Sequence, residues 1–362
     1  MLSACCVSAA AGLGAQSKKQ PGEDLSKSPV QSVWPLPPDE PRIKLVRTYS
    51  TSADVEGEIK KSKTLTIKEV LLGKGNVRDE GPKARGLRRP YGVAVDSKGR
   101  IFAADTELAS VFVFDAAART FSRLGGDERQ ATLRVPIGLA VDAHDNLYVA
   151  DNGHGAVLLF DANQQYQRML TARGDLEAPT GIAVDSEAGR LYATDTRRHT
   201  LTAFELTSGK VLKRIGQKGS KPGEFGWPNG VAVGPDGRVY VADTRNYRVQ
   251  VFDRDLKPVR QFGSLGVNPG QFRRPKGIAV DGEGVVYVVD SDFNNFQMFT
   301  PDGRGLLAVG EPGPRPGQMI LPAGVCTPRG QRRIYVTDQV NRRIQVFERV
   351  GPSMSQLLSR PK

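Results

Sequence analysis

Residues 228–252 read PNGVAVGPDGRVYVADTRNYRVQVF, and the fold can be predicted from the pattern of this stretch. It contains two apolar runs, Val231–Val233 and Val239–Ala242, which are separated by the turn sequence Pro235-Asp236-Gly237. A third run, Val249–Phe252, follows a polar loop. Short runs of Val, Tyr and Phe between Pro, Gly and Asp turns are typical of antiparallel strands. The stretch therefore predicts three consecutive strands joined by tight connections.

This pattern recurs along the chain. A Pro-x-Gly element starts each copy, and the glycines are 43 to 49 residues apart: Pro90-Tyr91-Gly92, Pro136-Ile137-Gly138, Pro179-Thr180-Gly181, Pro228-Asn229-Gly230, Pro275-Lys276-Gly277 and Pro322-Ala323-Gly324. An aspartate ends the second strand of each copy and a phenylalanine stands nine residues later, at Asp105/Phe114, Asp151/Phe160, Asp195/Phe204, Asp243/Phe252, Asp290/Phe299 and Asp338/Phe347. Five copies end in a further apolar run that predicts a fourth, outer strand. A four-stranded unit that repeats every 40–50 residues is a propeller blade. We therefore predict an all-β, six-bladed β-propeller with four antiparallel strands per blade.

The residues shared by the copies have structural interpretations. We expect the first strand to line the narrow channel, with small side chains at its centre: Ala94, Ala140, Ala183, Ala232, Ala279 and Cys326. On this interpretation Cys326 is a small buried apolar residue and has no redox role. The six aspartates are expected to accept backbone N–H groups of the following loop, because this is a common role of aspartate in turns.

The units resemble NHL repeats, and the resemblance covers residues 89–349. It is strongest at residues 241–252 and 337–347, where Asn-x-Arg precedes the third strand. The connectors Gly216–Phe225 and Gly263–Phe272, of the form Gly-x-x-Gly-x-x-Pro-Gly-x-Phe, are also similar to that family. The first three blades lack this connector and are divergent members. The resemblance implies the fold but no single function, because such propellers serve enzymes, receptors and RNA binders.

The last blade lacks an outer strand of its own, because Gly351-Pro352 follows Phe347 almost at once. Ile43–Thr48 alternates charged and apolar residues, so we expect it to supply this strand and close the ring. The expected organisation is a leader and linker at 1–41, a propeller at 42–349 with an insertion at 50–88, and a tail at 350–362. Within the insertion, Ile67–Leu72 predicts a short amphipathic helix that ends at Gly73.

The N-terminal region indicates a location. The stretch Trp34–Ile43 is rich in proline, and before a propeller it resembles uncharacterised bacterial six-bladed propeller lipoproteins. Leu2-Ser3-Ala4-Cys5 matches a lipobox, whose cysteine is acylated after cleavage. We therefore expect Cys5 to be lipidated and the protein to be an extracytoplasmic, membrane-anchored lipoprotein on the periplasmic side. Only four residues precede Cys5, so either the true start lies upstream or the lipobox match is accidental.

No catalytic or cofactor motif stands out. His144 is expected in a turn on the opposite face from the loops that carry His154 and His199, so the three cannot form one zinc site. No Glu, Asn and Asp set corresponds to a lactonase metal site, and nucleophile-elbow and nucleotide-binding fingerprints are missing. We therefore expect no cofactor, no metal and no enzymatic activity. A metal-dependent lyase or hydrolase, as some six-bladed propellers are, is the weaker alternative.

A basic face is the strongest functional indication. The chain carries a formal net charge of +12, and arginines are frequent in the connectors and in the loops after each second strand. These segments share one face of a propeller, where the expected ligand-binding residues are Tyr91, Arg197, Arg198, Asn229, Arg245, Arg273, Arg274, Lys276 and Arg342. Arg248 and Arg343, in contrast, are expected to be structural. The sequence thus predicts a monomeric, non-catalytic scaffold that binds a protein or other anionic ligand.

An RNA-binding propeller is the alternative within the binding class. Binding of single-stranded RNA needs aromatic side chains among the cations, and Tyr91, Trp227 and Tyr247 are the candidates. Nucleic acid is not the expected partner, because a membrane-anchored protein outside the cytoplasm would not meet it.

Overall fold

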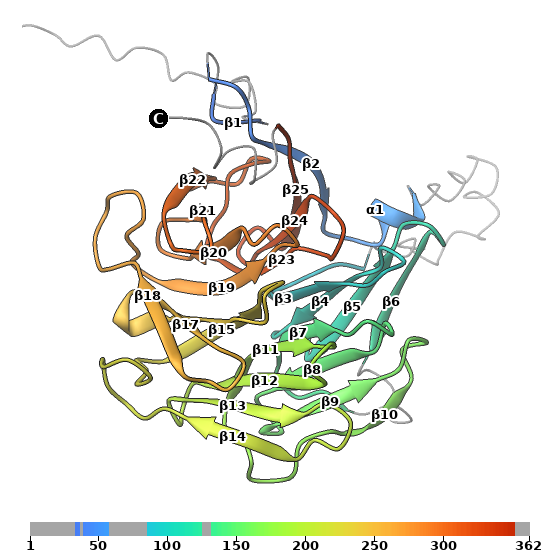
Figure 1. The fold of residues 1–362 in the computed structure, drawn as a ribbon. Helices are drawn as coiled ribbons and strands as arrows, with labels where there is room; N and C mark the ends of the chain where they lie inside the picture. Colours follow the sequence, from blue (N-terminus) through green and yellow to red (C-terminus); the bar gives the residue numbers. More distant parts are fainter. Residues whose placement is uncertain (1–32, 37–38, 58–84, 125–131, 352–362) are drawn as a thin grey trace, which may run out of the picture. The chain divides into compact units, whose positions relative to one another are not determined.

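The computed structural model describes residues 33–36, 39–57, 85–124 and 132–351. In this part of the chain, six antiparallel sheets follow one another in sequence order (Figure 1). The described helices are a single turn, α1 (Ala53–Glu56), and a 3-10 turn, η2 (Thr244–Asn246). The predicted all-β, six-bladed β-propeller is confirmed.

Each blade contributes an inner strand next to the channel and a second strand that is buried almost throughout. The inner strands are β3 (Pro90–Val95), β7 (Pro136–Val141), β11 (Pro179–Asp185), β15 (Pro228–Val233), β19 (Pro275–Val280) and β23 (Pro322–Cys326). The second strands are β4 (Ile101–Asp105), β8 (Leu147–Asp151), β12 (Arg190–Asp195), β16 (Val239–Asp243), β20 (Val286–Asp290) and β24 (Arg333–Asp338).

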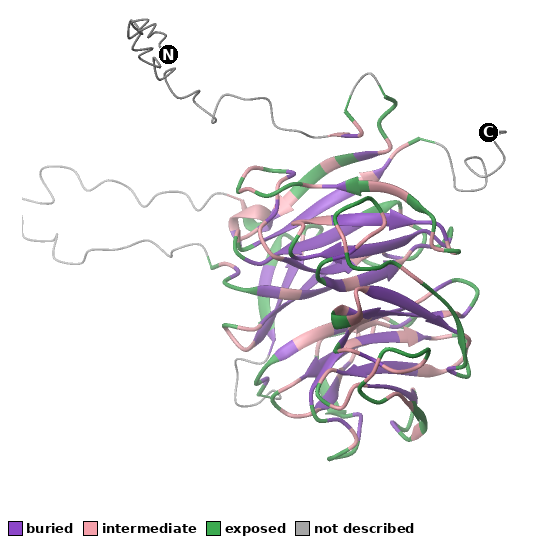
Figure 2. Ribbon diagram, turned by 90° about the vertical axis from the view of Figure 1, so that its left-hand side faces the viewer, coloured by how far each residue is buried: buried purple, intermediate pink, exposed green. Residues whose placement is uncertain are grey.

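The two remaining strands of each blade lie toward the outside. The third strands are β5 (Ser110–Asp115), β9 (Ala156–Phe160), β13 (Thr200–Glu205), β17 (Arg248–Phe252), β21 (Asn295–Phe299) and β25 (Arg343–Arg349). The outer strands of the first five blades are β6 (Thr120–Leu124), β10 (Tyr166–Met169), β14 (Val211–Ile215), β18 (Pro258–Phe262) and β22 (Gly305–Val309). The outer strands and the loops are the more exposed parts, whereas the second and third strands of the blades are mostly buried (Figure 2).

The inner strands begin two residues earlier than the glycines at which the sequence placed them. Pro90 pairs with Asp105 and Val93 pairs with Ala103, and the register shifts between these pairs. The same irregularity follows the first proline of the other inner strands. A bulge leaves a residue outside the ladder and can redirect its side chain. The bulge therefore leaves the middle residue of each Pro-x-Gly element outside the ladder. Tyr91, Asn229 and Lys276 are three of these middle residues.

The glycine after each bulge fixes the spacing between blades. A Cβ atom on Gly92 would lie 2.1 Å from the carbonyl oxygen of Ile137, and one on Gly324 would lie 2.3 Å from that of Tyr91. Corresponding contacts link every inner strand to the next, and β23 to β3, so the ring is closed. A side chain at any of these six glycines would therefore push neighbouring inner strands apart.

The hydrophobic core is divided into six clusters, and each cluster is shared by two neighbouring blades. The repeated phenylalanines are buried in these clusters, with an exposure of no more than 1%. Fully burying such a side chain contributes about 1.5–3 kcal/mol. A single blade would expose both of its apolar faces, so the ring is the unit that folds.

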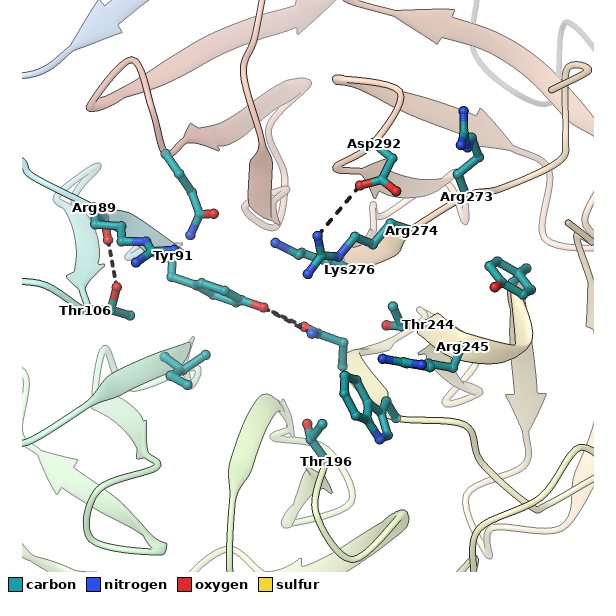
Figure 3. Close-up of a pocket in the computed structure, with 15 residues that line it drawn as sticks. Arg89, Tyr91, Thr106, Thr196, Thr244, Arg245, Arg273, Arg274, Lys276 and Asp292 are labelled. Carbon is teal, nitrogen blue, oxygen red and sulfur yellow. Dashed lines mark hydrogen bonds and ion pairs between the residues drawn. The ribbon is translucent and has the colours of Figure 1, made fainter. Parts of the chain in front are cut away.

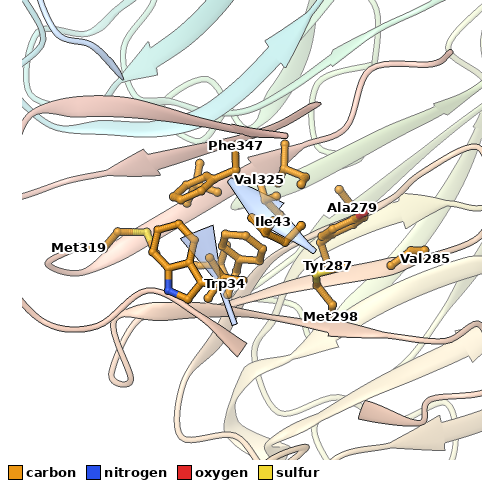
Figure 4. Close-up of a cluster of buried hydrophobic side chains, with 14 residues drawn as sticks. Trp34, Ile43, Ala279, Val285, Tyr287, Met298, Met319, Val325 and Phe347 are labelled. Carbon is orange, nitrogen blue, oxygen red and sulfur yellow. The ribbon is translucent and has the colours of Figure 1, made fainter. Parts of the chain in front are cut away.

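The N-terminal strand closes the last blade as predicted. Strand β2 (Ile43–Tyr49) pairs with β25 along its length. The sheet also extends beyond the expected boundary at residue 42, because β1 (Val33–Trp34) pairs with β2. Figure 4 shows Trp34 in the cluster between the fifth and sixth blades, where its ring centroid lies 5.6 Å from that of Phe347.

Several sequence-based expectations fall outside the described residues. These are the lipidation of Cys5, the helix at Ile67–Leu72 and, apart from its first two residues, the tail at 350–362. Within the described ranges, no helix is long and apolar enough to cross a membrane.

Candidate functional site

A pocket of about 690 Å³ lies at the channel mouth, on the face formed by the connectors and the loops that follow the second strands (Figure 3). Six of the nine expected ligand-binding residues line it: Tyr91, Asn229, Arg245, Arg273, Arg274 and Lys276. Arg89 adds a fifth cation to the lining, and Asp292 is the only carboxylate among the described lining residues. The pocket is therefore strongly cationic.

The repeated aspartates place these cations. Asp105 accepts hydrogen bonds from the backbone N–H groups of Arg88 and Arg89, at 2.6 and 2.9 Å. Asp290 does the same for Arg273 and Arg274, at 2.8 and 3.1 Å. Both aspartates also accept N–H groups of the following loop, as predicted, and both are fully buried. The arginine side chains are thus held in place through their backbone and remain exposed.

Tyr91 and Asn229 connect opposite sides of the ring. Tyr91 lies in the first blade and Asn229 in the fourth, and the Asn229 amide donates a hydrogen bond of 3.1 Å to the Tyr91 hydroxyl. Burial raises the pKa of Tyr91 above its ordinary value, against the opposing effects of the bond to Asn229 and the charge of Arg274. Tyr91 is therefore a neutral hydrogen-bonding group at the centre of the mouth (Figure 3).

Lys276 is the most unusual cation of the pocket. It is 8% exposed, and its ammonium lies 5.4 Å from the centroid of the Tyr91 ring. The described part of the chain offers this ammonium no hydrogen bond and no ion pair. Burial lowers the pKa of Lys276 to about 8; Arg274 adds to the effect, and Asp292 opposes it.

Aromatic side chains form the other wall. The Arg245 guanidinium lies 4.0 Å from the centroid of the Trp227 ring, which is cation–π geometry. Trp227 is 45% exposed, and Tyr247 lines the same pocket. The three aromatic candidates for base stacking, Tyr91, Trp227 and Tyr247, are therefore brought together.

The other three expected residues lie outside this pocket. Arg197 forms an ion pair of 3.1 Å with Glu177. Arg198 donates to the carbonyl oxygens of Gly174 and Asp175 at 2.9 and 3.0 Å. Arg342 is exposed in the loop before β25. The loop of the third blade thus turns its two arginines toward its own connector and away from the channel.

The hydroxyls that line the pocket were not predicted. Thr106, Thr196 and Thr244 each follow directly on a repeated aspartate, and Gln339 holds the same place in the last blade. Thr196 and Thr244 donate to the carbonyl oxygens of Pro228 and Pro275 in the next blade, at 3.0 and 2.7 Å. The position after each repeated aspartate is the signal that could have identified them.

Arg248 and Arg343 have the structural role expected of them. Arg248 pairs with Asp243 at 3.0 Å and donates to the carbonyl oxygens of Ser220, Lys221 and Glu224 in its connector. Arg343 makes equivalent bonds to Asp338 and to the connector of the sixth blade. Both side chains are buried, so these two arginines hold connectors to blades.

His154 and His199 have backbone partners, and Cys326 on the inner strand β23 is half-buried instead of fully buried as predicted. His154 contacts the carbonyl oxygen of Thr132 at 2.7 Å, and His199 contacts that of Phe225 at 3.1 Å. Burial raises the pKa of the Cys326 thiol to about 12. Within the described ranges, no three His, Cys, Asp or Glu side chains gather as a metal site would need.

Comparison with known sequences identifies the repeat. A family model described as the NHL repeat matches residues 225–252. RING finger protein nhl-1 of Caenorhabditis elegans is 45% identical over 53 residues, which are 15% of this chain and 5% of that protein. The human E3 ubiquitin-protein ligase TRIM32 is 50% identical over 52 residues, which are 14% of this chain and 8% of TRIM32. The similarity therefore spans only a small fraction of these relatives.

Solved structures share the fold at low identity. A gluconolactonase from Xanthomonas campestris has a TM-score of 0.56 at 18% identity, over 73% of this chain and 87% of that one. Virginiamycin B lyase from Staphylococcus aureus has a TM-score of 0.52 at 12% identity, over 72% and 95%. At such identities the likeness shows the fold alone. The chain is a six-bladed β-propeller that contains an NHL repeat at residues 225–252; its closeness to bacterial lipoproteins stays a prediction.

Proposed function

We propose that this propeller is a non-catalytic interaction scaffold that binds an acidic surface of a protein partner at its channel mouth. The observation that carries the proposal is the convergence of Arg89, Arg245, Arg273, Arg274 and Lys276 on one pocket with a single carboxylate, Asp292. Complementary charge speeds association and selects partners. Of these cations, Arg274 alone forms an ion pair among the described residues, a long one of 3.7 Å to Asp292.

The comparisons support a role in binding without defining it. The relatives that share the repeat include a ubiquitin ligase and a RING finger protein. The lyase and lactonase neighbours share the same ring, so the fold leaves catalysis open.

The test is a comparison of two charge-reversed triple variants. Arg245→Glu, Arg273→Glu and Arg274→Glu together reverse the mouth, whereas Lys98→Glu, Lys210→Glu and Lys257→Glu reverse three exposed lysines in turns of the opposite face. Each immobilised protein is used to capture partners from a membrane extract at low salt. We expect the control triple to keep the wild-type partners and the mouth triple to lose them. Equal capture by both variants would refute the proposal.

RNA binding is the second candidate, because Trp227, Tyr247 and Tyr91 lie in the same pocket as the cations. Stacking of a base on an aromatic ring contributes about 1–3 kcal/mol. Fluorescence anisotropy with a labelled single-stranded RNA tests this function. Binding that falls at least tenfold in Trp227→Ala would support it, whereas no binding at low salt would exclude it.

We also propose that the protein is anchored outside the cytoplasm through Cys5. The support is the Leu2-Ser3-Ala4-Cys5 sequence followed by a proline-rich segment. Mass spectrometry of the membrane-extracted protein should show an acylated N-terminal cysteine, and Cys5→Ala should release the protein from the membrane. An unmodified Cys5 inside a longer soluble chain would contradict this location.

A further inference from the structure

A buried ammonium without an acceptor is the starting observation. Lys276 follows Pro275 in the bulge of β19, so its side chain enters the mouth instead of the core between blades. Its neighbour across the channel is the face of the Tyr91 ring. A cation–π contact offsets only part of the hydration that a buried ammonium loses, because it supplies no hydrogen-bond acceptor.

The charges around Lys276 make its position less favourable. Arg89 of the first blade and Arg274, which lies two residues before Lys276, carry the same charge as Lys276 and lower its pKa. Asp292 and Asp290 oppose them, but Asp292 pairs with Arg274 and buried Asp290 accepts four backbone N–H groups. Arg245 and Arg273 complete the charged lining, and every one of its arginines is exposed. The centre of the mouth thus has an excess of donors and positive charge.

Figure 3 shows the ammonium of Lys276 directed toward Arg89 on one side of the Tyr91 ring, with Arg274 beside it. A guanidinium offers a planar fork of N–H donors, and an ammonium offers three donors from one point. An oxyanion between them would receive charge-assisted hydrogen bonds from separate blades. The Tyr91 hydroxyl is already hydrogen-bonded to Asn229, so Tyr91 forms a neutral wall of the site.

We propose that the channel mouth holds a site for one oxyanion group, a carboxylate or a phosphate monoester, with Lys276 as its central ligand and Arg89 and Arg274 on either side. The inference rests on the proposed function, because it names the chemical group that the mouth would take from a partner. It adds that binding is coupled to the protonation of Lys276. An oxyanion favours the ammonium over the neutral amine, so occupancy raises the pKa of Lys276 and binding weakens as the pH rises above about 8.

Competitive acetylation of the full-length protein tests the site. Trace acetic anhydride reacts only with neutral amines, and mass spectrometry follows the labelling of each lysine against pH. Without added anions, we expect half-maximal labelling of Lys276 near pH 8, and the labelling of exposed Lys98 is followed in the same samples. Saturating inorganic phosphate should reduce the labelling of Lys276 at pH 8 about fivefold, which corresponds to one pKa unit. Lys98 is the internal control for any effect of phosphate on the reagent.

Two further arms define the ligand and the site. Sodium acetate at the same ionic strength distinguishes a carboxylate from a phosphate, and either response supports the proposal. Arg89→Gln with Arg274→Gln should abolish the response, whereas Arg89→Lys with Arg274→Lys should retain part of it. Labelling of Lys276 that no anion changes, or that changes equally in the double Gln variant, would overturn the proposal.

The outcomes separate this inference from the proposed function. If the mouth triple loses its protein partners but no anion protects Lys276, the scaffold stands and the oxyanion site falls. If anions protect Lys276 but the mouth triple captures every wild-type partner, the site stands and the scaffold function falls.

Discussion

Arginines on one face of this propeller have two different roles. Arg248 and Arg343 are buried, each is paired with an aspartate, and each donates to carbonyl oxygens of a connector. Arg245 and Arg273 stand on the same face, exposed at the channel mouth, and Arg245 lies only three residues before Arg248. The difference in burial follows from the element that carries each arginine. Arg248 is the first residue of β17, whereas Arg245 lies in the turn η2.

Structural and binding arginines can be separated by whether their N–H donors already have acceptors in the fold. An arginine whose five N–H donors already have acceptors contributes to stability and has little left for a ligand. An exposed arginine at a pocket contributes little to stability and keeps its donors for a partner. Each prediction below tests one side of this division.

We expect the greatest loss of stability when a buried arginine is replaced. Arg248→Ala leaves Asp243 buried without its ion pair and the connector carbonyls of Ser220 and Lys221 without their donor, so we expect a loss of about 3–5 kcal/mol in the free energy of unfolding. Arg245→Ala is the matched control and should change stability by no more than about 0.5 kcal/mol. Urea unfolding followed by circular dichroism measures both. Equal losses of stability in the two variants would show that the buried and the exposed arginines do not differ in role.

A smaller loss of stability is expected at the glycines that set the spacing between neighbouring inner strands. A Cβ atom on Gly230 would lie 2.5 Å from the carbonyl oxygen of Lys276, so Gly230→Ala forces the fourth and fifth blades apart. We expect a loss of about 1–3 kcal/mol together with weaker binding at the mouth. Gly282→Ala, where the added atom meets nothing within 4 Å, is the control. If Gly230→Ala were neutral in both measurements, the mouth would not depend on the ring.

Lys276 should oppose folding, unlike the buried arginines. Its pKa is 10.5 in the unfolded chain and about 8 in the fold, so the folded state binds fewer protons between these values. Stability therefore rises with pH across this window, and the penalty is fully present below pH 8. We expect Lys276→Met to gain about 1–2 kcal/mol at pH 7 and to lose this gain near pH 10.5. A destabilised Lys276→Met protein at pH 7 would contradict this account.

The smallest effect is expected at Arg197, whose charge faces Glu177 and not the pocket. Arg197→Ala should cost no more than about 1 kcal/mol and leave partner capture unchanged. Arg273→Ala should be equally stable but should capture less partner. Capture that depends equally on both residues would extend the binding surface beyond the channel mouth.

Most of the fold could be predicted from the sequence because its information is local and repeated. The Asp-to-Phe spacing, the turns and the Pro-x-Gly elements are written six times, and Ile43–Thr48 shows its own alternation. Trp34 could not be placed in the last blade, since a proline-rich segment gives no strand signal.

The candidate site was only partly predictable. Its cations on connectors and at the centres of the Pro-x-Gly elements follow from the repeat, as Arg273 and Lys276 show. The pairing of Arg197 with Glu177, 20 residues earlier, depends on how one loop folds back on its connector. The burial of Lys276 depends on Tyr91, which is 185 positions away in the sequence and reaches it only when the ring closes.

Calorimetry of sulfate binding at pH 8.5 measures whether the mouth cations are free to bind an anion. Sulfate does not titrate in this range, so any proton exchanged belongs to the protein. Titrations in two buffers of different ionisation enthalpy should show an uptake of roughly half a proton for each sulfate bound by the wild-type protein, since the pKa of Lys276 starts at about 8. The same titrations of Lys276→Met should show no uptake. Equal heats in the two buffers for the wild-type protein, or no sulfate binding at all, would contradict the account.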